Sequence, residues 1–285
     1  MAGLTTLYAW TVPAFVAGSP VDHTWVTTYD NRVNAYPTDA QVASAGQFYW
    51  YCWGSFHPKG GTPAIPDGFL GSQSGDLALA QCLVQANADS RTAPAARGTI
   101  FVYGVDGVCH QLANQVLYAT GVGGTAPLTV RLARGYMAST FIYGTYGLQH
   151  TAWTNKIAGC SGARLTPPAD VRGPTMAGGA GGPGGPDEFE TRAREVLGAD
   201  NPKLLDLLRL RSDVHQFAAR AWPGTGQPSA EALNARNQHM LDEAARLLGP
   251  EKFKSIFGVS PGEKIDLVDE KISGSVGQIP PPTAR

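Results

Sequence analysis

The chain of 285 residues has few charged side chains and almost no net charge. Charged residues make up 16% of it, and 23 acidic against 22 basic side chains give a formal net charge of -1. The basic residues are scattered without a dense run, so they create no strong positive field for nucleic acid or acidic membranes. We therefore expect neither nucleic acid nor a membrane as a partner.

Long apolar runs are also missing. No stretch reaches the roughly 18 to 20 apolar residues that a membrane-spanning helix needs, and residues 1–16 show no basic region followed by a long apolar one. We expect no transmembrane segment, no Sec-type signal and a cytoplasmic location by default. Export without a cleavable signal stays open.

Cysteine is too scarce and too dispersed for a disulfide scaffold, so we expect mostly reduced thiols. The cysteines are Cys52, Cys82, Cys109 and Cys160. Among the cysteines and histidines, Cys52 and His57 come closest to the spacing of a structural zinc site without matching it. The glycines of 104–107 and 121–124 match neither a P-loop nor a dinucleotide fingerprint. We predict no metal and no cofactor.

What remains is the composition of a globular protein, with 43% apolar residues. Residues 167–186 are mostly glycine and proline and have too little apolar bulk to offset the entropy cost of ordering. They predict a flexible linker between an α+β candidate catalytic domain at 1–166 and a helical domain at 187–273. Residues 274–285 predict a disordered tail.

The first domain shows short segments rich in aromatic and β-branched residues, which favour strands. The predicted strands are 5–16, 23–29, 47–57, 99–103, 128–133 and 136–143, and the predicted helices are about 75–87 and 109–120. In the second domain, apolar residues recur at helical spacing in three segments. Asn201-Pro202 separates the first two of these segments, and Ser229 with Glu231 predicts the start of the third.

Cys109 lies where a glycine-bearing turn leads into the predicted helix at 109–120. At a helix start, unpaired N–H groups and the positive end of the dipole stabilise a thiolate, which lowers the pKa of a thiol from about 8.5. Cys109 is therefore a candidate nucleophile. The other three cysteines are by default buried structural residues.

A thiol nucleophile needs a base and a group that orients the base. His23 shares one face of its predicted strand with Trp25, so alternation presents an imidazole beside an aromatic side chain. We take His23 as the base and His57, at a strand end, as the orienting group. Asp30 and Asn31 are the alternatives to His57.

Two further side chains are expected to line the pocket. His110 follows Cys109 directly, and because adjacent helix residues do not face each other, it is a poor partner for the thiol. Trp50 belongs to an aromatic-rich segment with rings on both faces, which fits either a groove wall, shared with Trp25, or a strand buried on both sides.

The chain order of these residues resembles the circularly permuted papain-like fold, whose members include NlpC-type amidases and relatives of lecithin:retinol acyltransferase. The resemblance covers roughly residues 5–150 and depends on His23, His57 and Cys109. It implies an antiparallel sheet with the cysteine-bearing helix packed on it, followed here by a small all-α domain.

The resemblance also implies a thiol protease-like hydrolase or an acyltransferase. Cys109 would attack an amide or ester carbonyl to form a thioester, His23 would take and return the proton, and His57 would hold the imidazole. The oxyanion would be bound by the Cys109 backbone N–H and by Tyr103, each such donor being worth about 10² to 10³ in rate. The chain lacks the Asn-Cys-Glu-His pattern of the acyltransferase relatives, which favours small-molecule amide or peptide substrates over lipids.

A different class of protein fits the same sequence. The chain could be a non-catalytic binding or structural protein, with a β-rich domain tethered to a helical module that recognises a protein partner. In that case Cys109 would be buried, and its pKa would be unperturbed or raised.

Overall fold

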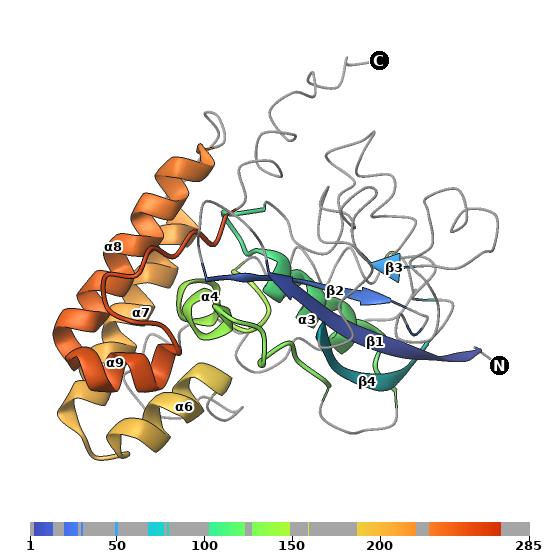
Figure 1. Ribbon diagram of the computed structural model, residues 1–285, viewed down its shortest axis with the longest axis horizontal. Helices are drawn as coiled ribbons and strands as arrows, with labels where there is room; N and C mark the ends of the chain where they lie inside the picture. The colour runs from blue at the N-terminus through green and yellow to red at the C-terminus, as the bar shows by residue number, and fades with distance from the viewer. Residues whose placement is uncertain are drawn as a thin grey trace.

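The molecule is an α+β protein in which one antiparallel sheet and a group of helices share a core (Figure 1). The computed structural model describes residues 3–13, 20–27, 30, 49–50, 68–76, 79, 103–122, 127–148, 159, 187–220 and 228–268. The α+β class predicted from the sequence is confirmed.

Four strands form the sheet in the order β3-β2-β1-β4. Their bounds are β1 Leu4–Pro13, β2 Asp22–Thr27, β3 Tyr49–Trp50 and β4 Phe69–Asp76. Ala9 of β1 pairs with Val26 of β2, and both are completely buried. The predictions for β1 and β2 are confirmed, because both segments combine β-branched and aromatic residues with a buried face.

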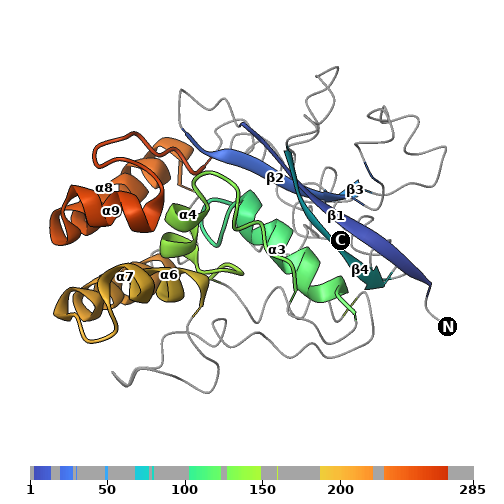
Figure 2. The same ribbon diagram turned by 60° about the horizontal axis from the view of Figure 1, so that its bottom comes forward.

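Helix α3, Cys109–Thr120, packs on one face of this sheet (Figure 2). Leu7 of β1 and Thr120 of α3 both lie against Gly75 of β4, where an added Cβ would be 2.5 Å from the Leu7 side chain and 3.2 Å from the Thr120 carbonyl oxygen. The face that carries Leu7, Ala9 and Val26 is therefore the α3 face. The predicted packing of the cysteine-bearing helix on an antiparallel sheet is confirmed.

Helix α4, Tyr136–Tyr143, was predicted as a strand, and that prediction is wrong. Its tyrosine, threonine, phenylalanine and isoleucine residues favour strands locally. However, the segment begins after Gly135, whose φ of 79° ends the preceding turn, and almost all of its side chains are buried between other helices. Tertiary packing on several sides overrides the local preference, as it commonly does for short apolar segments.

The strand predicted at 128–133 is also wrong, since residues 131–135 form turns. Side chains, and not a neighbouring strand, satisfy the backbone here. The N–H of Leu128 donates to Gln73 Oε1 at 2.7 Å, and the N–H of Val130 donates to Asn114 Oδ1 at 2.9 Å. Because these amides already have acceptors, the segment needs no strand pairing.

Strand β4 was not predicted, and a helix was expected from residue 75 onward. Its serine, glycine and aspartate residues have low strand propensity, yet it pairs with β1 along its length. Gly75 occurs where the Leu7 side chain and the α3 backbone leave no room for a Cβ. The expected helix does not include Gly75 or Asp76, although Leu79 is helical.

The helices after residue 187 are α6 Glu188–Leu197, α7 Pro202–Arg220, α8 Ala230–Leu248 and α9 Pro250–Phe257. The three helical segments predicted after residue 187 correspond to α6, α7 and α8, and a further helix, α9, was not predicted. Ser229 is the predicted N-cap, since its hydroxyl accepts a hydrogen bond from the Ala232 N–H at 3.1 Å. No helix in the described ranges is long and apolar enough to cross a membrane.

Helix α4 lies between α3 and the C-terminal helices (Figures 1 and 2). The Phe141 ring centroid is 5.2 Å from that of Phe189 in α6 and 5.3 Å from that of Phe257 in α9. The helices after residue 187 therefore share a core with α4, which precedes the predicted linker. That linker at 167–186 and the predicted tail at 274–285 lie outside the described residues.

Candidate functional site

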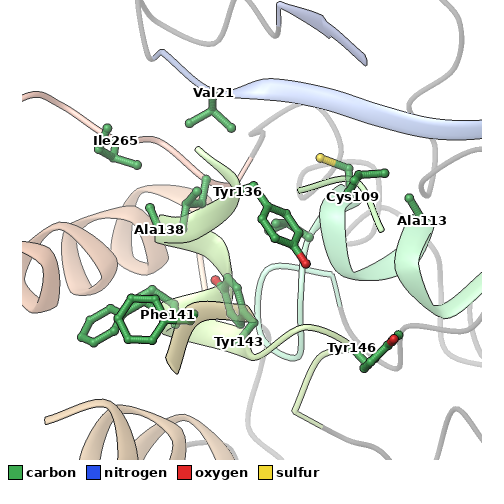
Figure 3. Packing of buried hydrophobic residues seen from close by; sticks show 14 of the residues in the cluster. Val21, Cys109, Ala113, Tyr136, Ala138, Phe141, Tyr143, Tyr146 and Ile265 are labelled. Atoms are coloured by element: carbon green, nitrogen blue, oxygen red, sulfur yellow. The ribbon is translucent and has the colours of Figure 1, made fainter. Parts of the chain in front are cut away.

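The start of β2 meets the start of α3, where two consecutive side chains of α3 contact one carbonyl oxygen. Cys109 Sγ lies 3.8 Å from the main-chain oxygen of Asp22, and His110 Nε2 lies 3.0 Å from the same oxygen. In Figure 3 the sulfur points toward this strand. Because a carbonyl oxygen can only accept, the thiol and Nε2–H are both donors.

Asp22 is also held through its other polar atoms. Its N–H donates to the Arg134 oxygen at 3.0 Å, and its Oδ2 accepts from the Arg134 N–H at 3.0 Å. We call Asp22, Arg134, Cys109 and His110 the Asp22 contact site. Asp22 is buried, so these bonds replace the water that its polar groups would otherwise bind. The first residue of β2 is therefore fixed against α3 and the turn before α4.

His110 is completely buried, and both of its ring nitrogens have partners. Nδ1 lies 2.8 Å from Ser139 Oγ, while Nε2 donates to Asp22. The Ser139 hydroxyl also lies 2.9 Å from the Tyr136 carbonyl oxygen. The Ser139 hydroxyl has one proton, so it can donate to only one of these two acceptors. With a neutral ring protonated at Nε2, His110 Nδ1 accepts from the hydroxyl. With both ring nitrogens protonated, the hydroxyl donates to the Tyr136 carbonyl oxygen instead.

His23 enters this region through its main chain. The backbone nitrogen of His23 is bonded to the carbonyl carbon of Asp22, and the oxygen of that carbonyl contacts the Cys109 thiol. Asp22, Thr24 and Val26 are buried on the α3 face, so strand alternation directs the half-buried His23 side chain to the opposite face. The structure therefore brings the main chain of His23 close to the thiol and points the imidazole away from α3.

The sheet face that carries His23 also carries a cluster of aromatic rings. Trp10 is completely buried, and its ring centroid lies 6.2 Å from that of Tyr8 and 5.3 Å from that of Phe69. In the backbone register Trp10 pairs with Trp25 of β2, and the neighbouring pair on the same face is Val12 with His23. The described rings on this face come from β1 and β4, whereas the predicted aromatic neighbour within β2, Trp25, has a side chain outside the described residues.

The remaining predicted site residues are placed as follows. Tyr103 is buried in the turn before α3, where it forms a bridge with Gly107. Trp50 belongs to β3 and pairs with Val26. Asp30 is half-buried, and His57 and Asn31 lie outside the described residues. Among the described residues, no group of three or more His, Cys, Asp or Glu could hold a metal ion.

Three buried polar side chains on α3 were missed by sequence reasoning. Gln111 donates to the Gly144 oxygen at 3.0 Å, Asn114 to the Thr145 oxygen at 2.9 Å and Gln115 to the Tyr146 oxygen at 2.5 Å. They therefore fasten the residues that follow α4 to α3. The signal was their spacing of three and four residues, which places their polar groups in one stripe along the helix.

Tyr136 and Glu188 form a second polar contact close to His110. The phenol donates to Glu188 Oε2 at 2.5 Å, and the Thr129 hydroxyl donates to Glu188 Oε1 at 2.6 Å. Burial, together with the nearby Glu188 charge, raises the pKa of Tyr136 well above its ordinary value. The phenol therefore stays protonated and remains a donor to the carboxylate.

Comparisons with protein-family models, with curated proteins and with solved structures found no match. The resemblance to the permuted papain-like fold accordingly stays a prediction. The functional proposal depends on the contacts of Cys109, His110, Asp22 and His23.

Proposed function

We propose that the protein is a cysteine-dependent hydrolase or acyltransferase that acts on an amide, peptide or ester bond through a thioester on Cys109. The observation that carries this proposal is the contact between the Cys109 thiol and the Asp22 carbonyl, directly beside the main chain of His23. A cysteine that opens a helix next to a histidine-bearing strand is the arrangement that the permuted papain-like order predicts.

The local electrostatics support a reactive thiol. Cys109 is the first residue of a helix of 12 residues, and no acidic residue occurs in the first turn. The positive end of the helix dipole therefore favours negative charge on the sulfur, with no carboxylate on the same turn to oppose it. The contact of Sγ with the Asp22 carbonyl oxygen favours the protonated thiol in the resting state, because only a protonated sulfur can donate to that oxygen.

In the proposed reaction, the Cys109 thiol gives its proton to His23, and the thiolate forms a C–S bond with the substrate carbonyl carbon. The carbonyl π electrons move to the oxygen and give a tetrahedral intermediate. When the C=O bond re-forms, the bond to the leaving nitrogen or oxygen breaks, and His23 gives its proton to that amine or alcohol. Water or another acceptor then cleaves the thioester and restores the thiol. For His23 to take part, its imidazole must turn from the sheet face to the edge of β2; the described residues of β3, 49–50, pair with Val26 and Thr27.

Burial favours the alternative, a non-catalytic binding or structural protein. Cys109 is only 5% exposed, and His110 is not exposed at all. Removing a thiolate from water raises the pKa of a thiol, so burial opposes the effect of the helix dipole. In this alternative, Cys109 and His110 serve to attach β2 to α3, and the C-terminal helices bind a protein partner.

Alkylation of the native protein with iodoacetamide between pH 5 and 9, with the adduct mapped by mass spectrometry, distinguishes the two proposals. We expect Cys109 to react faster and at lower pH than a free thiol, whose pKa is about 8.5. His23→Ala should lower the rate at pH 7 about tenfold, the effect of raising the thiol pKa by one unit. His239→Ala, which changes an exposed histidine on α8, should not alter the rate.

The opposite outcome favours the structural alternative. If Cys109 reacts only after denaturation, in the parent protein and in His23→Ala alike, the thiol is a packing residue. Faster labelling of another cysteine in the native protein would also contradict the assignment of Cys109 as the nucleophile.

A further inference from the structure

Tyr136 contacts the C-terminal helices and His110 at the same time, and Figure 3 shows its ring pointing from α4 toward α3. Its hydroxyl bonds to Glu188 of α6 at 2.5 Å and to Asn114 Nδ2 of α3 at 3.0 Å. The edge of its ring meets the His110 ring, with 5.8 Å between centroids. Its carbonyl oxygen is also within hydrogen-bonding distance of Ser139 Oγ, the partner of His110 Nδ1.

Glu188 is the first residue of α6, and both of its carboxylate oxygens are occupied by hydroxyl donors. Oε2 accepts from Tyr136 and Oε1 from Thr129. Hydrogen bonds from hydroxyls to a carboxylate are short and about twice as strong as neutral ones. One side chain therefore ties the start of the C-terminal helices to both the start of α4 and the segment before it.

A separate ion pair docks α6 in another way. Asp187, the N-cap of α6, pairs with Arg211 of α7, and Arg211 donates to the Thr140 oxygen of α4 at 3.0 Å. The phenylalanine contacts of Phe189 add to this docking. Changing Glu188 alone therefore leaves the main attachment of α6 in place, which makes the Glu188 contact testable in a folded protein.

From these contacts we propose that Glu188 and Tyr136 are positioning residues through which the C-terminal helices hold the Asp22 contact site in place. The path runs from Glu188 to Tyr136, from Tyr136 to His110 directly and through Ser139, and from His110 to the Asp22 carbonyl that receives the Cys109 thiol. Tyr136, Ser139 and His110 are buried, so water cannot replace a lost contact without cost. The consequence for thiol reactivity rests on the proposed function, whereas the coupling of the two regions does not.

The test uses the full chain with Glu188→Gln and Tyr136→Phe. The glutamine has a single side-chain oxygen in place of two, so the hydroxyls of Tyr136 and Thr129 no longer each have a carboxylate acceptor. The control is Glu195→Gln on the same helix, where the glutamate side chain is 58% exposed and pairs with Arg192 on the surface.

The first measurement is hydrogen exchange of the Asp22 and Arg134 amides, which report the Asp22 contact site without involving the thiol. Glu188→Gln and Tyr136→Phe should speed exchange at both amides about tenfold or more, the effect of losing one hydrogen bond to a charged group. Glu195→Gln should leave both rates unchanged. The exchange rates of α8 amides near Ala244, which is buried but belongs to none of these contacts, should change less than those of Asp22 and Arg134.

The second measurement is the pH profile of Cys109 alkylation, which should shift in Glu188→Gln and Tyr136→Phe but not in Glu195→Gln. Exchange that rises equally at Asp22, Arg134 and the α8 amides would overturn the inference, because it would show general destabilisation. If Cys109 in the parent protein is unreactive, the proposed function fails, and the exchange rates still decide whether Glu188 and Tyr136 position the Asp22 contact site.

Discussion

Phe141→Ala is expected to lower the free energy of unfolding by about 3 to 5 kcal/mol, the usual cost of removing a buried phenylalanine ring. Phe141 is completely buried in α4, and its ring contacts those of Phe189 and Phe257. The substitution leaves a cavity where α4, α6 and α9 meet. Because Phe141 joins the part of the chain before the predicted linker to the part after it, the loss should weaken their association directly.

Urea denaturation followed by circular dichroism measures this effect. Leu205→Ala in α7 is the matched control, because Leu205 is 54% exposed and its truncation should change stability by no more than about 0.5 kcal/mol. A loss below about 1 kcal/mol for Phe141→Ala, well short of the range for such rings, would show that the C-terminal helices do not share a core with α4.

Arg211→Leu is expected to cost a similar amount, about 3 to 5 kcal/mol, because it leaves the Asp187 carboxylate buried without its counter-charge. The two side chains are only 11% and 6% exposed. Arg211 also donates to the Thr140 oxygen and lies over the Phe189 ring at 4.9 Å. The variant therefore loses a charge pair, a hydrogen bond to α4 and a cation–π contact together.

The same ion pair predicts a pH dependence. Burial alone would raise the pKa of Asp187, but the Arg211 charge and the hydrogen bonds from Arg211 and from the Glu190 N–H hold it below its ordinary value. An aspartate with a lower pKa in the folded state than in the unfolded state stabilises the fold above about pH 4, near its unfolded pKa. This stabilisation is lost as the pH falls through the folded-state pKa.

Unfolding free energies measured in steps from neutral to acid pH test this dependence. Asp187→Asn should be less stable than the parent protein at pH 7 and should lose less stability on acidification. Asp206→Asn, which changes an exposed carboxylate on α7, should keep the parent stability at pH 7. An acid loss in Asp187→Asn as large as in the parent protein would assign the effect to other carboxylates.

Much of the fold could be predicted from the sequence where the signal is local. Helix α3 begins at Cys109 and ends at Thr120 as predicted, because its apolar spacing and the flanking glycine turns are contained in the segment itself. The predicted cap at Ser229 is present for the same reason. Strand β4 and helix α4 could not be predicted, because their local composition favours the wrong structure and distant residues decide the outcome.

The candidate site divides in the same way. The sequence by itself determined that a cysteine opens a helix and that a histidine belongs to an early strand, since both depend on neighbouring residues. Only the tertiary structure decided that the thiol and His110 share the Asp22 carbonyl, and that alternation turns the His23 side chain from α3. These contacts join residues 87 and 88 positions apart, and such pairings depend on how strands and helices pack, which no local pattern records.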